Sequence, residues 1–318
     1  MKQQIILGSR GSDLALTQAR MAETALRARW PEVEIAIEVI KTSGEESANS
    51  AGAIPEPQVD RAGRKGLFTA EIERALTAGT IDLAVHSAKD LPSVLGAGTE
   101  IAAVLPRAIT HDVLVTLAKA DIQSLPREPT VATGSVRRQH QLRWIRSDVV
   151  VPDLRGNVPT RVRKLVQNNW DGVVLAAAGL ERLGMAVTGE SVDFEGTEIF
   201  FSILPPEVFV PAGGQGTIAL QTRLSDQRNR SLAESISHWS TAVCLRAERE
   251  FLRLLKADCN EPVGVRAMVE GDLMKIQGQL FEPNSDEPRQ AVVEGHAENA
   301  EQLAANLLQQ INGDKIES

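Results

Sequence analysis

Residues 3–18 read QQIILGSRGSDLALTQ, in which an apolar run passes through a short polar turn into a segment with helical spacing. Residues 3–7 predict a buried strand. A helix is predicted from Ser12, because apolar residues then recur every three or four positions, at Ala15, Ala19, Ala22 and Leu26. The stretch therefore predicts a strand followed directly by a helix, the repeating unit of α/β folds.

The same alternation continues along much of the chain. Before Pro106 we expect a strand at 33–39, a helix over about 67–78 and a strand at 81–85. After Pro106 we expect strands near 113–117, 130–133, 149–154 and 172–177, with helices opening at Ser135 and Asn157. Strands that alternate with helices predict an α/β fold with mostly parallel sheets.

The pattern changes after Pro211. A long helical stretch over about 226–256 is followed by strand patterns at 264–270, 273–281 and 291–295, and by a final helix from 296. Strands grouped together between two helical segments predict a small α+β domain at the C-terminal end.

The composition bounds the class of protein. A chain of 318 residues that is 42% hydrophobic predicts two or three domains. Two cysteines, Cys244 and Cys259, are too few for a disulfide framework. No apolar run is long enough for a signal peptide or a membrane span, so we expect a cytoplasmic protein without a membrane partner. A net charge of -8 and 3% aromatic residues argue against nucleic-acid binding.

Arginines gather near predicted helix starts. Three strands run into a small polar residue with arginine nearby: Arg10 with Ser12, Ser135 with Arg137 and Arg138, and Arg155 with Asn157 and Arg161. Helix N-termini and guanidinium groups both bind carboxylates, so the three places together predict an anion cleft. The alternative for each place alone is an ordinary helix cap beside a solvated arginine.

Two further residues are candidates for chemistry. Asp90 follows the apolar strand IDLAV (81–85) within HSAKDLP (86–92) and could act as an acid or base, or form a surface turn with Lys89. His86 fits a structural histidine. Cys259 lies in ADCNEP (257–262), where a loop thiol could anchor a covalent group or be a small hydrophobic residue. Cys244 fits the latter. The sequence has no metal-ligand spacing and no nucleotide motif.

In this order, these segments resemble the porphobilinogen deaminase (hydroxymethylbilane synthase) family over nearly the whole chain. The resemblance rests on a series of blocks: R-x-S-x-L-A-x-x-Q at 10–18, GRKGLF at 63–68, HSAKDLP at 86–92, GSVRRQHQL at 134–142, LRGNVPTR at 154–161, AAAGLERLG at 176–184 and VPAGGQGTIAL at 210–220.

The resemblance implies two α/β lobes like those of periplasmic binding proteins and a small C-terminal α+β domain. The implied domains are 1–106 with about 205–224, then 107–204, then 225–318. A dipyrromethane cofactor would be attached to Cys259 through a thioether and would prime the addition of four porphobilinogen molecules, with loss of ammonia, to give hydroxymethylbilane. Asp90 would protonate the leaving amine and stabilise the cations that follow.

The resemblance also assigns the binding residues and the oligomeric state. Besides Cys259, the residues implied to hold the cofactor are Arg137, Arg138, Lys89, Ser87, Ser135 and Arg161. Those implied to hold substrate are Arg10, Ser12, Arg155, Arg182, Lys65, Phe68 and Gln18. Family members are expected to be monomers.

Two alternatives keep the same lobes. One is a non-catalytic anion-binding protein, which would need neither Asp90 nor Cys259. The other is a paralogue that has lost cofactor attachment. Only the chemistry at Cys259 would distinguish this paralogue from an active enzyme.

Overall fold

The computed structural model describes residues 4–40, 61–185, 187, 191–256, 261–282, 285 and 287–313, with the backbone alone for residues 61–69. These residues form two compact units, which the chain builds by passing between them more than once. The first unit comprises Met1–Arg107 and Thr217–Leu245, and the second comprises Ala108–Gly216 and Arg246–Ser318. The division into three domains stays a prediction.

The first unit opens with the strand and helix that the sequence predicts. β1 (Gln4–Ser9) leads into α1 (Asp13–Arg29), and Ser12 occupies the N-cap position. Its Oγ accepts a hydrogen bond from the Ala15 N–H at 3.4 Å, which satisfies one of the unpaired donors at the helix start. Asp13 in the first turn and arginines in the last turn complement the helix dipole.

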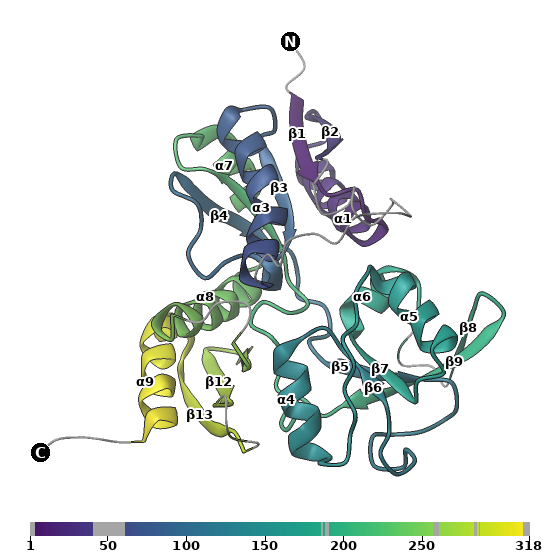
Figure 1. Cartoon of the computed structure of the whole chain (residues 1–318). Helices are drawn as coiled ribbons and strands as arrows, with labels where there is room; N and C mark the ends of the chain where they lie inside the picture. Colours follow the sequence, from purple (N-terminus) through teal and green to yellow (C-terminus); the bar gives the residue numbers. More distant parts are fainter. Residues whose placement is uncertain are drawn as a thin grey trace, which may run out of the picture. The chain divides into compact units, whose positions relative to one another are not determined.

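The sheet of the first unit has the strand order β2-β1-β3-β10-β4 (Figure 1). β2 (Glu34–Val39) and β3 (Leu83–Ser87) run parallel to β1. β10 (Ile218–Arg223) runs antiparallel to both β3 and β4 (Thr99–Val104). Four of the five strands therefore run in the same direction, as the prediction of a mostly parallel sheet requires. The exception is β10, which belongs to a chain segment that re-enters the unit at Thr217 and runs through the sheet in reverse.

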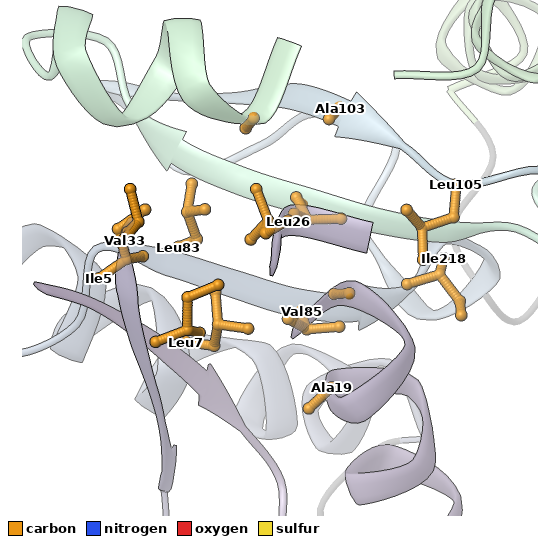
Figure 2. Close-up of a cluster of buried hydrophobic side chains, with 14 residues drawn as sticks. Ile5, Leu7, Ala19, Leu26, Val33, Leu83, Val85, Ala103, Leu105 and Ile218 are labelled. Atoms are coloured by element: carbon orange, nitrogen blue, oxygen red, sulfur yellow. The ribbon is translucent and has the colours of Figure 1, made fainter. Parts of the chain in front are cut away.

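Helices cover both faces of this sheet. Ala19, Ala22 and Leu26 of α1, with Ala233 of α7 (Gln227–Glu234), pack on one face. Figure 2 shows Ala19 and Leu26 of α1 in one cluster with strand side chains such as Leu7 and Val85. On the opposite face lies α3 (Arg61–Ala78), whose Ile72 and Leu76 contact Ile81 and Ala84. Three layers are the expected result when a sheet has two apolar faces.

The second unit repeats this plan with the strand order β6-β7-β5-β9-β8. An isolated parallel bridge between Thr130 and Val150 lies beyond β6. β5 is antiparallel to both of its neighbours, so the strand that follows the chain's passage at Arg107 again runs in reverse, and the edge strand β8 runs in the same direction as β5. The strands are β5 (Asp112–Thr116), β6 (Val131–Ala132), β7 (Gly172–Ala176), β8 (Ser191–Phe194) and β9 (Thr197–Leu204).

Helices also cover both faces of the second sheet. α5 (Val158–Gln167) and α6 (Ala177–Arg182) pack on one face through Leu165 and Leu180. α4 (Val136–Ile145) packs on the other face through Leu142. Both sheets therefore lie at the centre of an α/β lobe, as expected from the sequence.

The C-terminal part is a three-stranded antiparallel meander with helical cover. Gly278 lies where Phe251, Leu307 and Ile311 approach the sheet, and an added Cβ would meet their side chains at 3.1 Å or less. The elements are α8 (Trp239–Leu254), β11 (Val263–Glu270), β12 (Leu273–Leu280), β13 (Arg289–His296), a 3-10 turn (Ala297–Asn299) and α9 (Ala300–Asn312). The predicted fold class, two α/β lobes with a small α+β part, is confirmed.

Several predicted boundaries were wrong. α3 begins at Arg61 rather than near Leu67, because Gly63 and Gly66 weaken the helical signal in the sequence. The helical stretch over 226–256 is two helices, since Ser237 and His238 leave the helix to hydrogen-bond the backbone of Val104 on β4. The strand expected at 149–154 is reduced to the bridge at Val150. Strands β4, β8, β9 and β10 were missed.

No helix in the described ranges has both the length and the apolar character that crossing a membrane requires.

Gly216 is predicted to be a stability-critical glycine. Its φ is +83°, and an added Cβ would lie 2.5 Å from the carbonyl oxygen of Ala108, a backbone atom that cannot swing away. Gly216→Ala should lower the free energy of unfolding by about 2–3 kcal/mol. Gly271→Ala is the matched control, because Gly271 has φ +58° but open space around it, so only the strain of about 1 kcal/mol applies. Equal losses in thermal unfolding would contradict the clash.

Candidate active site

Three predicted site residues meet at the carboxyl ends of two neighbouring strands in the first unit. Arg10 directly follows β1, Ser87 ends β3, and these strands are parallel neighbours. Gln18, buried on α1, donates from Nε2 to Ser87 Oγ at 2.7 Å. Because parallel strands end at the same edge of a sheet, the chain brings Arg10, Gln18 and Ser87 together there.

Asp90 lies at the same edge. It ends a 3-10 turn (Ala88–Asp90) that follows β3 without a break. The Ala88 N–H donates to the Thr217 carbonyl at 3.0 Å, which anchors the turn to the segment leading into β10. Lys89 and Asp90 are half-buried, so the turn is more enclosed than a free surface turn.

His86 is a buried structural residue beside this turn, as the conservative interpretation of the sequence predicted. Its Nε2 lies 2.9 Å from Gln221 Oε1. Gln221 Nε2 donates to Glu73 Oε1 at 2.9 Å and to Thr99 Oγ1 at 2.8 Å, so its carbonyl oxygen faces the imidazole, and the imidazole carries its proton on Nε2. Burial lowers the pKa of His86 to about 4, although Glu73 and Asp90 act in the opposite direction.

In the second unit, the arginine-bearing segments also follow parallel strands. Arg137 and Arg138 lie in the first turn of α4 after β6, Arg155 follows the bridge at Val150, and Arg182 ends α6 after β7. β6 pairs in parallel with β7, and Thr130, just before β6, bridges Val150 in parallel. These segments therefore leave the sheet at one edge.

Arg137 and Arg138 share one buried carboxylate, that of Asp112 at the start of β5. Arg137 Nη2 donates to Asp112 Oδ2 at 2.8 Å, and Arg138 Nη2 donates to Asp112 Oδ1 at 2.7 Å. Asp112 is 0% exposed, and the arginines are 4% and 5% exposed. Burial alone would raise the pKa of Asp112, but the two guanidinium charges outweigh it and hold that pKa well below its usual range. We call these three residues the Asp112 cluster.

The other arginines contact backbone or nearby carboxylates. Arg155 Nε donates to Asp153 Oδ2 at 2.8 Å on the surface, and Arg161 Nε donates to the Gly156 carbonyl at 2.7 Å. Arg182 Nη2 donates to the Gly216 carbonyl at 2.7 Å, and burial lowers the pKa of Arg182 to about 10, so it stays charged at neutral pH.

The two predicted caps of this unit differ. Asn157 Oδ1 accepts from the Thr160 N–H at 2.9 Å and is an ordinary N-cap. Ser135 occupies the N-cap position of α4, but its side chain makes no cap hydrogen bond. Its hydroxyl is therefore not committed to the helix, which suits a binding role.

Buried donors in the second unit fit an anionic group. The Nε–H groups of Arg137, Arg138 and Arg182 are buried and meet no acceptor within the described part of the chain. Leaving a buried donor unpaired costs about 1–3 kcal/mol, so such groups are rare in folded proteins. Carboxylates of a bound group would supply the missing acceptors.

Several predicted residues cannot be placed. Cys259 lies outside the described residues, and for Lys65 and Phe68 only the backbone of α3 is described. Cys244, predicted to be a small buried hydrophobic residue, is buried on α8, and this prediction is confirmed. The roles given to the other site residues stay predictions.

Sequence reasoning missed Asp112. The signal was present, since an acid opens the otherwise apolar strand DVLVT (112–116), and a buried carboxylate requires a cation or several donors. Gln215, whose Nε2 donates to Asp112 Oδ1 at 2.9 Å, was quoted only as part of the block at 210–220.

The pKa of His86 predicts a loss of stability in acid. Above pH 6.5 the imidazole is neutral in both the folded and unfolded states, but between pH 6.5 and 4 only the unfolded state takes up the proton. The free energy of unfolding should therefore fall by up to about 3 kcal/mol over this range. His86→Gln, which can still donate to Gln221, should remove this component of the pH dependence. An NMR titration midpoint of His86 near 6.5 would contradict the burial argument.

Comparisons with known proteins identify the family of the chain. A family model described as "Porphobilinogen deaminase, dipyromethane cofactor binding domain" matches residues 5–231, and one described as "Porphobilinogen deaminase, C-terminal domain" matches residues 242–313. The porphobilinogen deaminase of Roseiflexus sp. (strain RS-1) is 41% identical over 88% of this chain and 86% of its own length. That of Moorella thermoacetica is 38% identical over 99% of this chain and 96% of its own length. The chain belongs to the porphobilinogen deaminase family.

Proposed function

We propose that the chain polymerises four porphobilinogen molecules head to tail into hydroxymethylbilane, with release of ammonia, in tetrapyrrole biosynthesis. A dipyrromethane cofactor, attached to Cys259 through a thioether, serves as the primer. The observation that supports this most directly is the set of buried, unpaired Nε–H groups on Arg137, Arg138 and Arg182. Pyrroles that carry acetate and propionate groups present the acceptors that these donors need.

The cofactor, when bound, supplies the pyrrole carbon at which chain growth begins. Arg137 and Arg138 would hold its carboxylates through their buried Nε–H donors, and Arg161, Ser135, Ser87 and Lys89 would complete the binding set. The uncommitted hydroxyl of Ser135 lies at the start of α4, where the partial positive charge of the helix favours an anion.

Substrate carboxylates bind to a second set of donors. The donors of this set are Arg10, Ser12, Gln18, Arg155, Arg182 and Lys65, and Phe68 adds an apolar contact. Arg10 at the end of β1 and Arg182 at the end of α6 each follow a strand of a central sheet, so both are carried on rigid elements. Rigid placement orients the substrate before the reaction.

Asp90 handles the proton. A carboxyl oxygen of Asp90 donates a proton to the amino nitrogen of porphobilinogen as the carbon–nitrogen bond breaks and ammonia leaves. The resulting carboxylate stabilises positive charge on the substrate, and it accepts the proton released when the new carbon–carbon bond forms. The anchored turn after β3 holds Asp90 in place for both steps.

The chain acts, in this proposal, as a cytoplasmic monomer without nucleic-acid or membrane partners. The net charge of -8 supports the absence of nucleic acid, because binding to phosphates requires a broad basic face. The two alternatives, a non-catalytic anion-binding protein and a relative without cofactor, both predict an unmodified Cys259.

Cys259→Ser should abolish cofactor attachment. Intact-mass measurement of the purified protein should show an adduct of dipyrromethane mass on the unaltered chain and none on the variant, because serine is a poor nucleophile without an activating base. Cys244→Ala is the control, since Cys244 is buried on α8, and this variant should keep the adduct. An unmodified wild-type mass that stays unmodified after porphobilinogen is added would favour the non-catalytic alternatives.

Asp90→Asn should retain the adduct and the fold but lower kcat by about a thousandfold or more, since general acid–base catalysis contributes on this scale. Asp82→Asn is a matched control that alters a carboxylate just before β3, at the end opposite Asp90. It should lower the unfolding temperature but preserve turnover. Normal kcat in Asp90→Asn would remove Asp90 from the mechanism.

A further inference from the structure

We infer that Asp112 is a positioning residue, which fixes the direction in which Arg137 and Arg138 present their remaining donors to the carboxylates of the cofactor. This inference rests on the proposed function. It concerns a residue that touches neither cofactor nor substrate in the proposed mechanism and that acts only through the two arginines.

The geometry commits one side of each guanidinium to the protein. Arg137 uses Nη2 for Asp112 and Nη1 for Gln141 Oε1 at 2.7 Å and the Val210 carbonyl at 2.8 Å. Arg138 uses Nη2 for Asp112 and Nη1 for the Val174 carbonyl at 2.9 Å. In both cases the Nε–H is left without an acceptor among the described residues. A planar guanidinium fixed at both terminal nitrogens has one orientation, so the direction of Nε is also fixed.

A second layer of amides locks this arrangement. Gln215 Nε2 donates to Asp112 Oδ1 at 2.9 Å and to the Thr110 carbonyl at 2.6 Å, which limits rotation of the carboxylate. Gln141 Nε2 donates to Gln279 Oε1 at 2.6 Å, which connects the Arg137 side of the cluster to β12. The Asp112 cluster therefore joins β5, α4 and the C-terminal sheet, and a binding group held in this way keeps its geometry before any ligand arrives.

The net charge of the Asp112 cluster distinguishes a positioning role of Asp112 from a purely electrostatic role. Two guanidinium groups and one carboxylate leave one net positive charge. Replacing Asp112 by asparagine would increase that charge by one, so an account based on charge alone predicts tighter binding of a carboxylate-bearing cofactor. Positioning predicts the opposite, because two like charges released from their shared carboxylate repel each other and turn away from the ligand.

The test is Asp112→Asn, compared with the unaltered chain and with Asp82→Asn as a control for lost stability. Asp82 accepts hydrogen bonds from Ile6 N–H and Asn229 in the other unit, away from the Asp112 cluster. Intact mass should show that the adduct-bearing fraction of Asp112→Asn falls by about tenfold, while Asp82→Asn stays loaded. Among loaded molecules, KM should rise more than kcat falls, since arginine geometry affects binding and Asp90 is untouched.

A second variant covers the case in which Asp112→Asn does not fold. Asp112→Glu keeps the charge but moves the carboxylate by one methylene, so positioning predicts partial loss of the adduct, whereas charge alone predicts full loading. Full loading and unchanged KM in the folded Asp112 variants would overturn the inference. A wild-type chain that never carries the adduct would instead contradict the proposed function, and the role of Asp112 would fall with it.

Discussion

The second unit depends on the ion pairs between the buried carboxylate of Asp112 and the guanidinium groups of Arg137 and Arg138. Two guanidinium groups cannot be buried side by side unless an anion lies between them, because removing their water costs several kcal/mol for each charge. Asp112 binds one arginine through each oxygen, at 2.7 and 2.8 Å. Further hydrogen bonds surround this group. The Val174 carbonyl accepts from Arg138, and the Val210 carbonyl accepts from Arg137 and Gln141. Gln215 donates to Asp112. The result is a rigid cationic group with unpaired Nε donors. A carboxylate-bearing cofactor requires such donors.

The sheets explain why the chemistry gathers at strand ends. In each unit, one strand follows directly after the chain crosses into that unit: β10 in the first unit and β5 in the second. This strand runs antiparallel to both of its neighbours. The parallel strands beside it all end at one edge, where helices begin and donors are unpaired. Asp90 and Arg10 leave one sheet in this way, and Arg137 and Arg182 leave the other. One architectural feature thus places Asp90, to which we assign the proton transfers, and the arginines, to which we assign carboxylate binding.

Local features could be predicted from the sequence, and long-range ones could not. The β1–α1 unit and the Ser12 cap follow from spacing and capping preferences within a few residues. The reversed direction of β10 depends on where the chain crosses between units, which no local pattern encodes. The partners of Arg137 are equally non-local: Asp112 and Val210 lie 25 and 73 positions away, so spacing could identify the arginine but not what holds it. His86 was judged structural because a lone histidine after a buried strand usually is, and its contacts with Gln221 agree.

The most direct test of this account is a crystal structure of the purified protein with its cofactor attached. The account predicts that the Nε atoms of Arg137 and Arg138 lie about 2.7–3.1 Å from cofactor carboxylate oxygens, within hydrogen-bond range, while their Nη2 atoms remain on Asp112. Cofactor carboxylates bound elsewhere, with both Nε groups still unpaired or turned to other protein atoms, would contradict it.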